Sequence, residues 1–266
     1  MIINLTAPRN WNELSEQQVV YVARVLSQKP TKEELLTRCF LKFTGLHPVL
    51  ITRQMRKMSK LLGRPVPFLY RYKRKVIALP AEDVQSFCSQ LEYLTGEPGL
   101  MKCPARLSGL YGPDVQLWTV SFEAYLMADR FYRAYSQSKD TAHLYSMIGV
   151  LWRKKGAAYS DSVVERNARK IRRHTTPDEC NAVFLWWTGI KLWLKEKYPD
   201  LFTAKSPEDT EEQPDESYMV MNMLYAITEG RAHENKQVFS TPVHEVLHAL
   251  NTKAKQIHEM NAKTKT

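Results

Sequence analysis

The stretch Thr176–Tyr198, TPDECNAVFLWWTGIKLWLKEKY, predicts a helix around which the rest of the chain is organised. Thr176 is a suitable N-cap, Pro177 fits the first turn, and Glu179, three residues after the cap, completes a capping box. Apolar side chains then cover almost the whole circumference, and they include three of the six tryptophans. Because a helix that is apolar nearly all round is usually buried, we expect other helices to pack around it. The stretch therefore indicates a scaffold.

The composition is that of a globular protein. A chain of 266 residues, 44% of them apolar, can bury a large core. No stretch approaches the ~20 apolar residues that span a bilayer, and the N-terminal residues lack the pattern of a secretory signal. The four cysteines are scattered without a C-x-x-C pair. We therefore expect a cytoplasmic protein in a reducing compartment, without a membrane segment.

Helical spacing of apolar residues recurs along most of the chain. Capping boxes at Ser15 and Thr31 start the first two predicted helices, and Gly45 is expected to end the second. Further helices are predicted over about 48–63, 81–95, 120–136, 139–153, 162–173, 217–229 and 241–260. Alternation over 68–79 predicts one small β-hairpin.

An acidic segment interrupts this pattern near the C-terminus. Residues 205–217, KSPEDTEEQPDES, contain no apolar residue, which is typical of a mobile linker. The sequence thus predicts a mainly α fold with a multi-helix globular core at 1–204. The linker at 205–217 and a tethered C-terminal pair of helices at 218–266 would follow it.

The segment HEVLH, which begins at His244, matches the H-E-x-x-H pattern of zinc hydrolases. In that chemistry His244 and His248 would bind zinc, and Glu245 would deprotonate a metal-bound water. The extended form of the motif fails, because Asn251 and Ala254 stand where glycine and the third histidine belong. The apolar stripe of the predicted helix leaves both histidines partly exposed on its polar flank. We therefore interpret the match as fortuitous and keep a zinc hydrolase as an alternative. The candidates for a missing ligand are Glu229, His233 and Glu234.

Positive charge concentrates in one part of the sequence. The formal net charge is +10, and nine cations occur between residues 53 and 75 without an acidic residue among them. These nine are Arg53, Arg56, Lys57, Lys60, Arg64, Arg71, Lys73, Arg74 and Lys75. Because Phe68, Tyr70 and Tyr72 are interleaved with them, the segment could neutralise phosphates and stack bases. It could equally dock an acidic protein or the chain's own acidic linker, or be a plain solvated surface. A second basic face lies on the predicted helix at 162–173.

Five segments of the sequence together resemble those of a protein family. They are NWNELSEQQVVYVARVL at 10–26, FEAYLMADRFYRAY at 122–135, LWRKK at 151–155, FLWWTGIKLWLKEKYPDLF at 184–202 and NKQVFSTPVHEVLHALNTKAK at 235–255. With them the chain resembles a family of bacterial and prophage proteins whose genes sit among tail-structure genes. The resemblance implies a small cytoplasmic accessory protein, similar to a phage tail-assembly chaperone, that binds another polypeptide. It implies no catalytic residue, and the histidines of HEVLH are not part of the family pattern.

The preferred hypothesis is a non-enzymatic, prophage-derived assembly or adaptor protein without a cofactor. A phage structural protein is the candidate partner, and the C-terminal helices with the basic segment would bind it. The alternatives from other classes are a nucleic-acid-binding protein that uses residues 53–75 and a zinc hydrolase that uses His244, Glu245 and His248.

Overall fold

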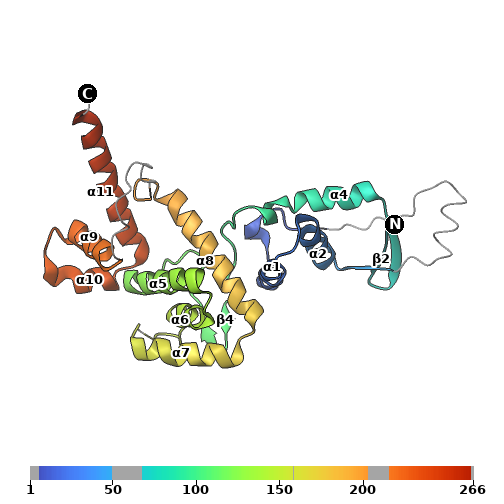
Figure 1. The fold of residues 1–266 in the computed structure, drawn as a ribbon, viewed down its shortest axis with the longest axis horizontal. Helices are drawn as coiled ribbons and strands as arrows, with labels where there is room; N and C mark the ends of the chain where they lie inside the picture. Colours follow the sequence, from blue (N-terminus) through green and yellow to red (C-terminus); the bar gives the residue numbers. More distant parts are fainter. Residues whose placement is uncertain (1–5, 50–67, 158, 203–215, 265–266) are drawn as a thin grey trace, which may run out of the picture. The chain divides into compact units, whose positions relative to one another are not determined.

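The computed structural model describes residues 6–49, 68–157, 159–202 and 216–264, and most of these residues are helical (Figure 1). The predicted mainly α fold is confirmed. The chain divides into two compact units, Met1–Lys102 and Cys103–Thr266. Within the described residues, no helix combines the length and the apolar character that crossing a membrane requires.

The first unit combines helices with a small antiparallel sheet. Its helices are the 3-10 turn η1 (Trp11–Glu13), α1 (Glu16–Ser27), α2 (Lys32–Thr44), α4 (Ala81–Gln90) and the 3-10 turn η2 (Glu92–Thr95). Both predicted capping boxes form, at Ser15 and Thr31. Gly45 ends α2 with a φ of 69°, a left-handed conformation that glycine adopts without steric cost. The unit's core includes Val22, Phe40 and Leu91.

The sheet has three strands in the order β1 (Leu46–Pro48), β2 (Phe68–Tyr72) and β3 (Lys75–Leu79). The β2–β3 pair is the predicted hairpin, with Tyr72 opposite Lys75. β1 was not predicted. It pairs with β2, and its Pro48 stands opposite Tyr70, so the helix predicted from residue 48 does not begin there. Residues 50–63 of that predicted helix lie outside the described ranges.

The second unit is a helical assembly with a short hairpin, β4 (Arg106–Leu107) and β5 (Leu110–Tyr111). Its helices are α5 (Phe122–Ser138), α6 (Thr141–Leu151), α7 (Asp161–His174), α8 (Pro177–Lys197), α9 (Glu216–Thr228), η3 (Ala232–Glu234), α10 (Asn235–Ser240) and α11 (Val243–Thr264). The helix α6 packs against α5, α7 and α8. Its contact with α7 is close, because a Cβ on Gly149 would stand 2.9 Å from the Val164 carbonyl oxygen.

The tryptophan helix α8 is buried as predicted and starts with the predicted capping box. Trp186 and Trp187 are inaccessible to solvent, and Trp186 meets the buried Trp152 edge-on at a centroid distance of 5.7 Å. Trp187 packs against Tyr125 of α5. Trp193, in contrast, is only half-buried, so the last two turns of α8 border the surface.

The C-terminal helices α9, α10 and α11 belong to the second compact unit, Cys103–Thr266. The Val243 N–H donates to the Val120 carbonyl at 2.8 Å, and the Phe122 N–H donates to the Thr241 carbonyl at 2.9 Å. The first half of the α11 stripe is buried, including Leu247. This stripe therefore packs into the core of the second unit. Residues 203–215 are outside the described part of the chain.

Candidate functional site

The first histidine of HEVLH is a structural residue of the core. His244 is buried, with Nδ1 2.8 Å from the Tyr198 hydroxyl and Nε2 2.6 Å from the Gln116 carbonyl oxygen. A carbonyl oxygen can only accept, so the proton is assigned to Nε2, and Nδ1 accepts from Tyr198. Burial lowers the pKa of His244. The hydrogen bond to Gln116 acts in the opposite direction, and the nearby Lys197 ammonium lowers the pKa further. The ring is therefore neutral at pH 7 and both of its nitrogens are occupied.

The second histidine of the motif has a different environment. His248 and Glu245 are exposed, while His244 is enclosed between Trp118, at a centroid distance of 4.1 Å, and Trp193, at 5.7 Å. The expectation that His244 is partly exposed was wrong, because the loop that carries Trp118 covers this flank of α11. The expectation for His248 is confirmed.

The candidate third ligands do not complete a metal site either. Glu229 pairs with Lys253 at 3.4 Å, and His233 lies 3.8 Å from Glu234 on an exposed turn. Among the residues that the structure describes, no group of three His, Cys, Asp or Glu side chains is arranged to hold a metal ion. The geometry around His244 and His248 is therefore that of a packed helix.

An aromatic and cationic cluster surrounds His244. The Lys197 ammonium lies 4.1 Å from the ring centroid of Trp118, 4.6 Å from that of Trp193 and 5.6 Å from that of Tyr198. Burial lowers the pKa of Lys197. Because cations and indole faces attract each other, this cluster links α8 and α11 to the loop around Trp118. No periodic signal in the sequence could bring these residues together.

A carboxylate fixes the loop that covers His244. Asp114 accepts hydrogen bonds from the backbone N–H groups of Gln116, Trp118 and Thr119, at 2.9 to 3.1 Å. Burial would raise its pKa, but the hydrogen bonds from Trp118 and Thr119 outweigh this and hold the pKa below its ordinary value. These hydrogen bonds within the loop fix its conformation. The cluster around His244 is therefore a structural contact that holds α8, α11 and this loop together.

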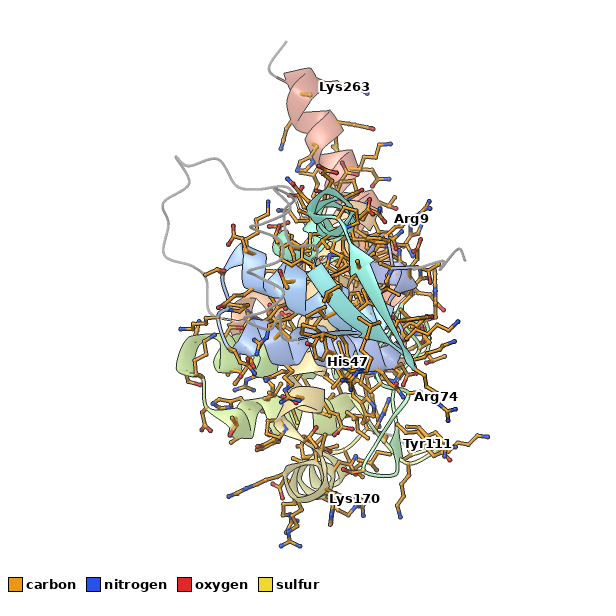
Figure 2. All side chains as sticks on the ribbon, turned by 90° about the vertical axis from the view of Figure 1, so that its right-hand side faces the viewer. Arg9, His47, Arg74, Tyr111, Lys170 and Lys263 are labelled. Carbon is orange, nitrogen blue, oxygen red and sulfur yellow. The ribbon has the colours of Figure 1, made fainter. Side chains whose placement is uncertain are left out.

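The predicted basic segment is described only in part. Arg71, Lys73, Arg74 and Lys75 belong to the β2–β3 hairpin, and Arg74 lies at its turn (Figure 2). The other five members, Arg53, Arg56, Lys57, Lys60 and Arg64, lie outside the described residues.

The aromatic residues interleaved with the hairpin's cations do not form one exposed platform. Tyr70 is buried and meets Phe40 edge-on, with ring centroids 6.2 Å apart. Phe68, in contrast, is 47% exposed. Of these three aromatic residues only Tyr70 is buried in the core, and Phe68 is the one exposed ring of the described hairpin.

A second basic region is fully described and lies on α7. This helix buries Val164, Asn167 and Ile171, and so its arginines point away from the core. Its position on α6 is fixed by the Asn167 amide, which donates to the Gly149 carbonyl at 3.2 Å and to the Trp152 carbonyl at 3.0 Å. The helix begins at Asp161, after Ser160, one residue before the predicted range of 162–173.

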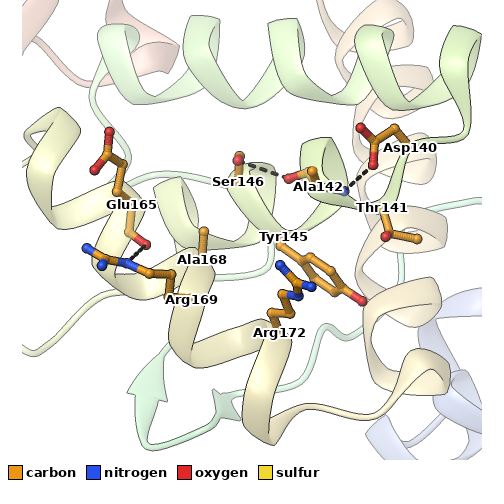
Figure 3. A pocket seen from close by; sticks show the side chains of 9 residues that line it. All are labelled: Asp140, Thr141, Ala142, Tyr145, Ser146, Glu165, Ala168, Arg169 and Arg172. Atoms are coloured by element: carbon orange, nitrogen blue, oxygen red, sulfur yellow. Dashed lines mark hydrogen bonds between the residues drawn. The ribbon is translucent and has the colours of Figure 1, made fainter.

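An open groove of about 730 Å³ runs between α6 and α7 (Figure 3). Arg169 and Arg172 line it from α7, and Tyr145 and Ser146 line it from α6. The side chains of Arg172 and Tyr145 point into the same space (Figure 3). Asp140 and Glu165 contribute carboxylates to the lining, so this groove has mixed charge.

A separate, mostly apolar groove of about 380 Å³ lies between α5, α8 and α9. Its apolar lining includes Leu126, Leu192, Leu201, Phe202, Val220 and Met223. Asp129 also lines the groove and pairs with Lys191 and, at 3.1 Å, with Arg133. Lys195 is a third cation of the lining, so the charged residues of this groove have a net positive charge.

No protein-family model matches this chain, and comparison with curated proteins and with solved structures gave no significant match.

Proposed function

We propose that this chain is a non-enzymatic assembly or adaptor protein that binds another polypeptide in the groove between α5, α8 and α9. The observation that carries the proposal is the composition of that groove, whose lining is mostly apolar and includes the three cations Arg133, Lys191 and Lys195 beside the single carboxylate of Asp129. Its volume falls in the ~300–1,000 Å³ range of ligand sites. A peptide with an apolar anchor and an acidic neighbour would match both features.

The resemblance to prophage proteins supports the same class of function. It implies a cytoplasmic accessory protein that acts on a phage structural protein, in the manner of a tail-assembly chaperone. The environment of His244 also favours binding over hydrolysis, because both ring nitrogens are engaged within the protein. The occupant that we propose is therefore a segment of a structural protein encoded beside this chain.

The test is a pull-down between the purified chain and each purified product of its flanking genes. Leu126→Asp places a charge in the half-buried lining of the groove and should abolish the interaction. Met221→Asp is the matched control, because Met221 is 67% exposed on α9 and does not line the groove. Binding to none of the flanking products, or equal loss in both variants, would refute the proposal. Self-association that Leu126→Asp alone removes would assign the groove to a second copy of the chain instead.

A further inference from the structure

The outward face of α7 carries a regular row of guanidinium groups. Arg166, Arg169 and Arg173 are exposed and stand three and four residues apart, which places them along one side of the helix over about 10 Å. No ion pair within the described part of the chain includes any of the three. Their charge is therefore available to an external anion.

The β4–β5 hairpin extends this row into a wider surface. The Ser108 and Thr175 hydroxyls are 2.6 Å apart, which joins the hairpin to the end of α7. Tyr111 and Arg153 exchange backbone hydrogen bonds of 2.8 and 3.0 Å, which join the hairpin to the segment after α6. We name the cations on these three elements the α7 basic surface. Its members are Arg106, Arg153, Lys154, Lys155, Arg166, Arg169, Lys170, Arg172 and Arg173.

The α7 basic surface is built from stretches of sequence without acidic residues. Segments 101–113, 151–160 and 166–177 contain neither aspartate nor glutamate. Tyr111 and Lys170 are among the labelled side chains of Figure 2, and Tyr111 is 43% exposed. The Arg106 guanidinium lies 4.6 Å from the Tyr111 ring centroid, so the surface also presents an aromatic ring with a cation stacked on it.

Arg153 is the member that points most directly to a ligand. Its side chain is half-buried, and it takes part in none of the ion pairs among the described residues. Removing a guanidinium from water without a counter-ion is unfavourable, and a bound phosphate would offset that cost.

We propose that the α7 basic surface binds the phosphate backbone of a nucleic acid. A protein partner fits less well, because protein interfaces centre on apolar or aromatic anchors. Among the described residues of α7, the β4–β5 hairpin and the segment after α6, Tyr111 is the one exposed large apolar side chain. Asn167, the amide side chain of α7, is buried and already bonded, so it does not read base edges.

The experiment measures binding of the full chain to a fluorescein-labelled 20-base-pair duplex, and to the matching single strand, by anisotropy between 50 and 300 mM salt. The test variant is Arg166→Gln/Arg169→Gln/Arg173→Gln. The control variant is Arg71→Gln/Lys73→Gln/Arg74→Gln, on the β2–β3 hairpin. Both remove three exposed positive charges, so they change the net charge equally.

The α7 variant should weaken duplex binding about 10- to 100-fold at 100 mM salt and reduce the salt slope by about 2–3, since each lost phosphate contact contributes about 0.9. The control variant should lose less than about threefold in affinity for the duplex.

Equal losses of affinity in the two variants, or no binding of either oligonucleotide, would overturn the proposal. Loss in the control variant alone would assign binding to the β2–β3 hairpin. Competition by poly-glutamate as effective per charge as that by the oligonucleotide would identify an acidic-protein site instead. Melting temperatures of both variants equal to that of the parent chain would exclude misfolding as the cause.

Discussion

Replacing Trp187 by alanine tests whether α8 is the core of the second unit. The side chain is inaccessible to solvent and packs against Trp186, with ring centroids 5.8 Å apart, and against Tyr125, at 5.7 Å. A buried tryptophan removes about 150–250 Å² from water, which at about 25 cal/mol per Å² corresponds to ~4–6 kcal/mol as an upper estimate. Measured substitutions of this kind cost about 3–5 kcal/mol, and we expect that range for Trp187→Ala.

Two further variants separate burial from other effects. Trp193 lies on the same helix but is only half-buried, so Trp193→Ala should cost about half as much, roughly 1–3 kcal/mol. Trp187→Phe keeps most of the ring volume and deletes an indole N–H that is buried without a hydrogen-bond partner. Deleting an unpaired donor recovers about 1–3 kcal/mol, and so this variant should stay within about 1.5 kcal/mol of the parent chain.

Urea unfolding followed by circular dichroism and by tryptophan fluorescence measures these differences. The first unit contains a single tryptophan, Trp11, whereas the other five lie in the second unit. If the units unfold separately, the substitutions should shift only the transition of the second unit. A loss below about 1.5 kcal/mol for Trp187→Ala, or one no greater than that for Trp193→Ala, would show that α8 is not the centre of this core.

Three other changes test the packing around this helix. Gly149→Ala should destabilise the second unit by about 1–3 kcal/mol in thermal unfolding, because the added Cβ would meet the Val164 carbonyl oxygen and the Ala168 nitrogen at 2.9 and 3.0 Å. Asn167→Ala removes two buried hydrogen bonds and should cost about 2–3 kcal/mol in the same measurement; an unchanged melting temperature would contradict this. The pKa of His244 is lowered by burial, so the unfolded chain binds more protons and the free energy of unfolding should fall as pH decreases below about 6.5. His244→Gln should flatten that slope in urea titrations between pH 7 and 5, and an identical slope would exclude His244 as its source.

The features predicted correctly from the sequence are those that depend on neighbouring residues. Capping boxes at Ser15, Thr31 and Thr176 act over three residues, and all three form. The burial of α8 follows from its apolar circumference, which is also a local property. The prediction was incomplete at Trp193, because its exposure depends on how far the neighbouring elements extend along α8.

The features that were missed depend on residues far apart in the chain. β1 exists because Leu46 and Pro48 find partners on β2, more than 20 residues later, and three residues carry too little alternation to signal a strand. The burial of His244 depends on Gln116 and Trp118, 128 and 126 residues earlier in the chain. Helical periodicity correctly placed this histidine beside the apolar stripe, but a distant loop then covers that flank.

HEVLH matches a known catalytic pattern and α7 matches none, yet the structure favours α7 as the binding site. HEVLH contains residue types suited to zinc, yet the hydrogen bonds to Tyr198 and Gln116 engage the donor atoms of its first histidine. On α7 the opposite holds, because Gly149 and Asn167 fix one face of the helix to α6 and leave its arginines outside. Residue types alone do not distinguish the two cases. The distinction lies in whether the polar atoms already have partners inside the protein, and by that criterion α7 is better placed than HEVLH to bind a ligand.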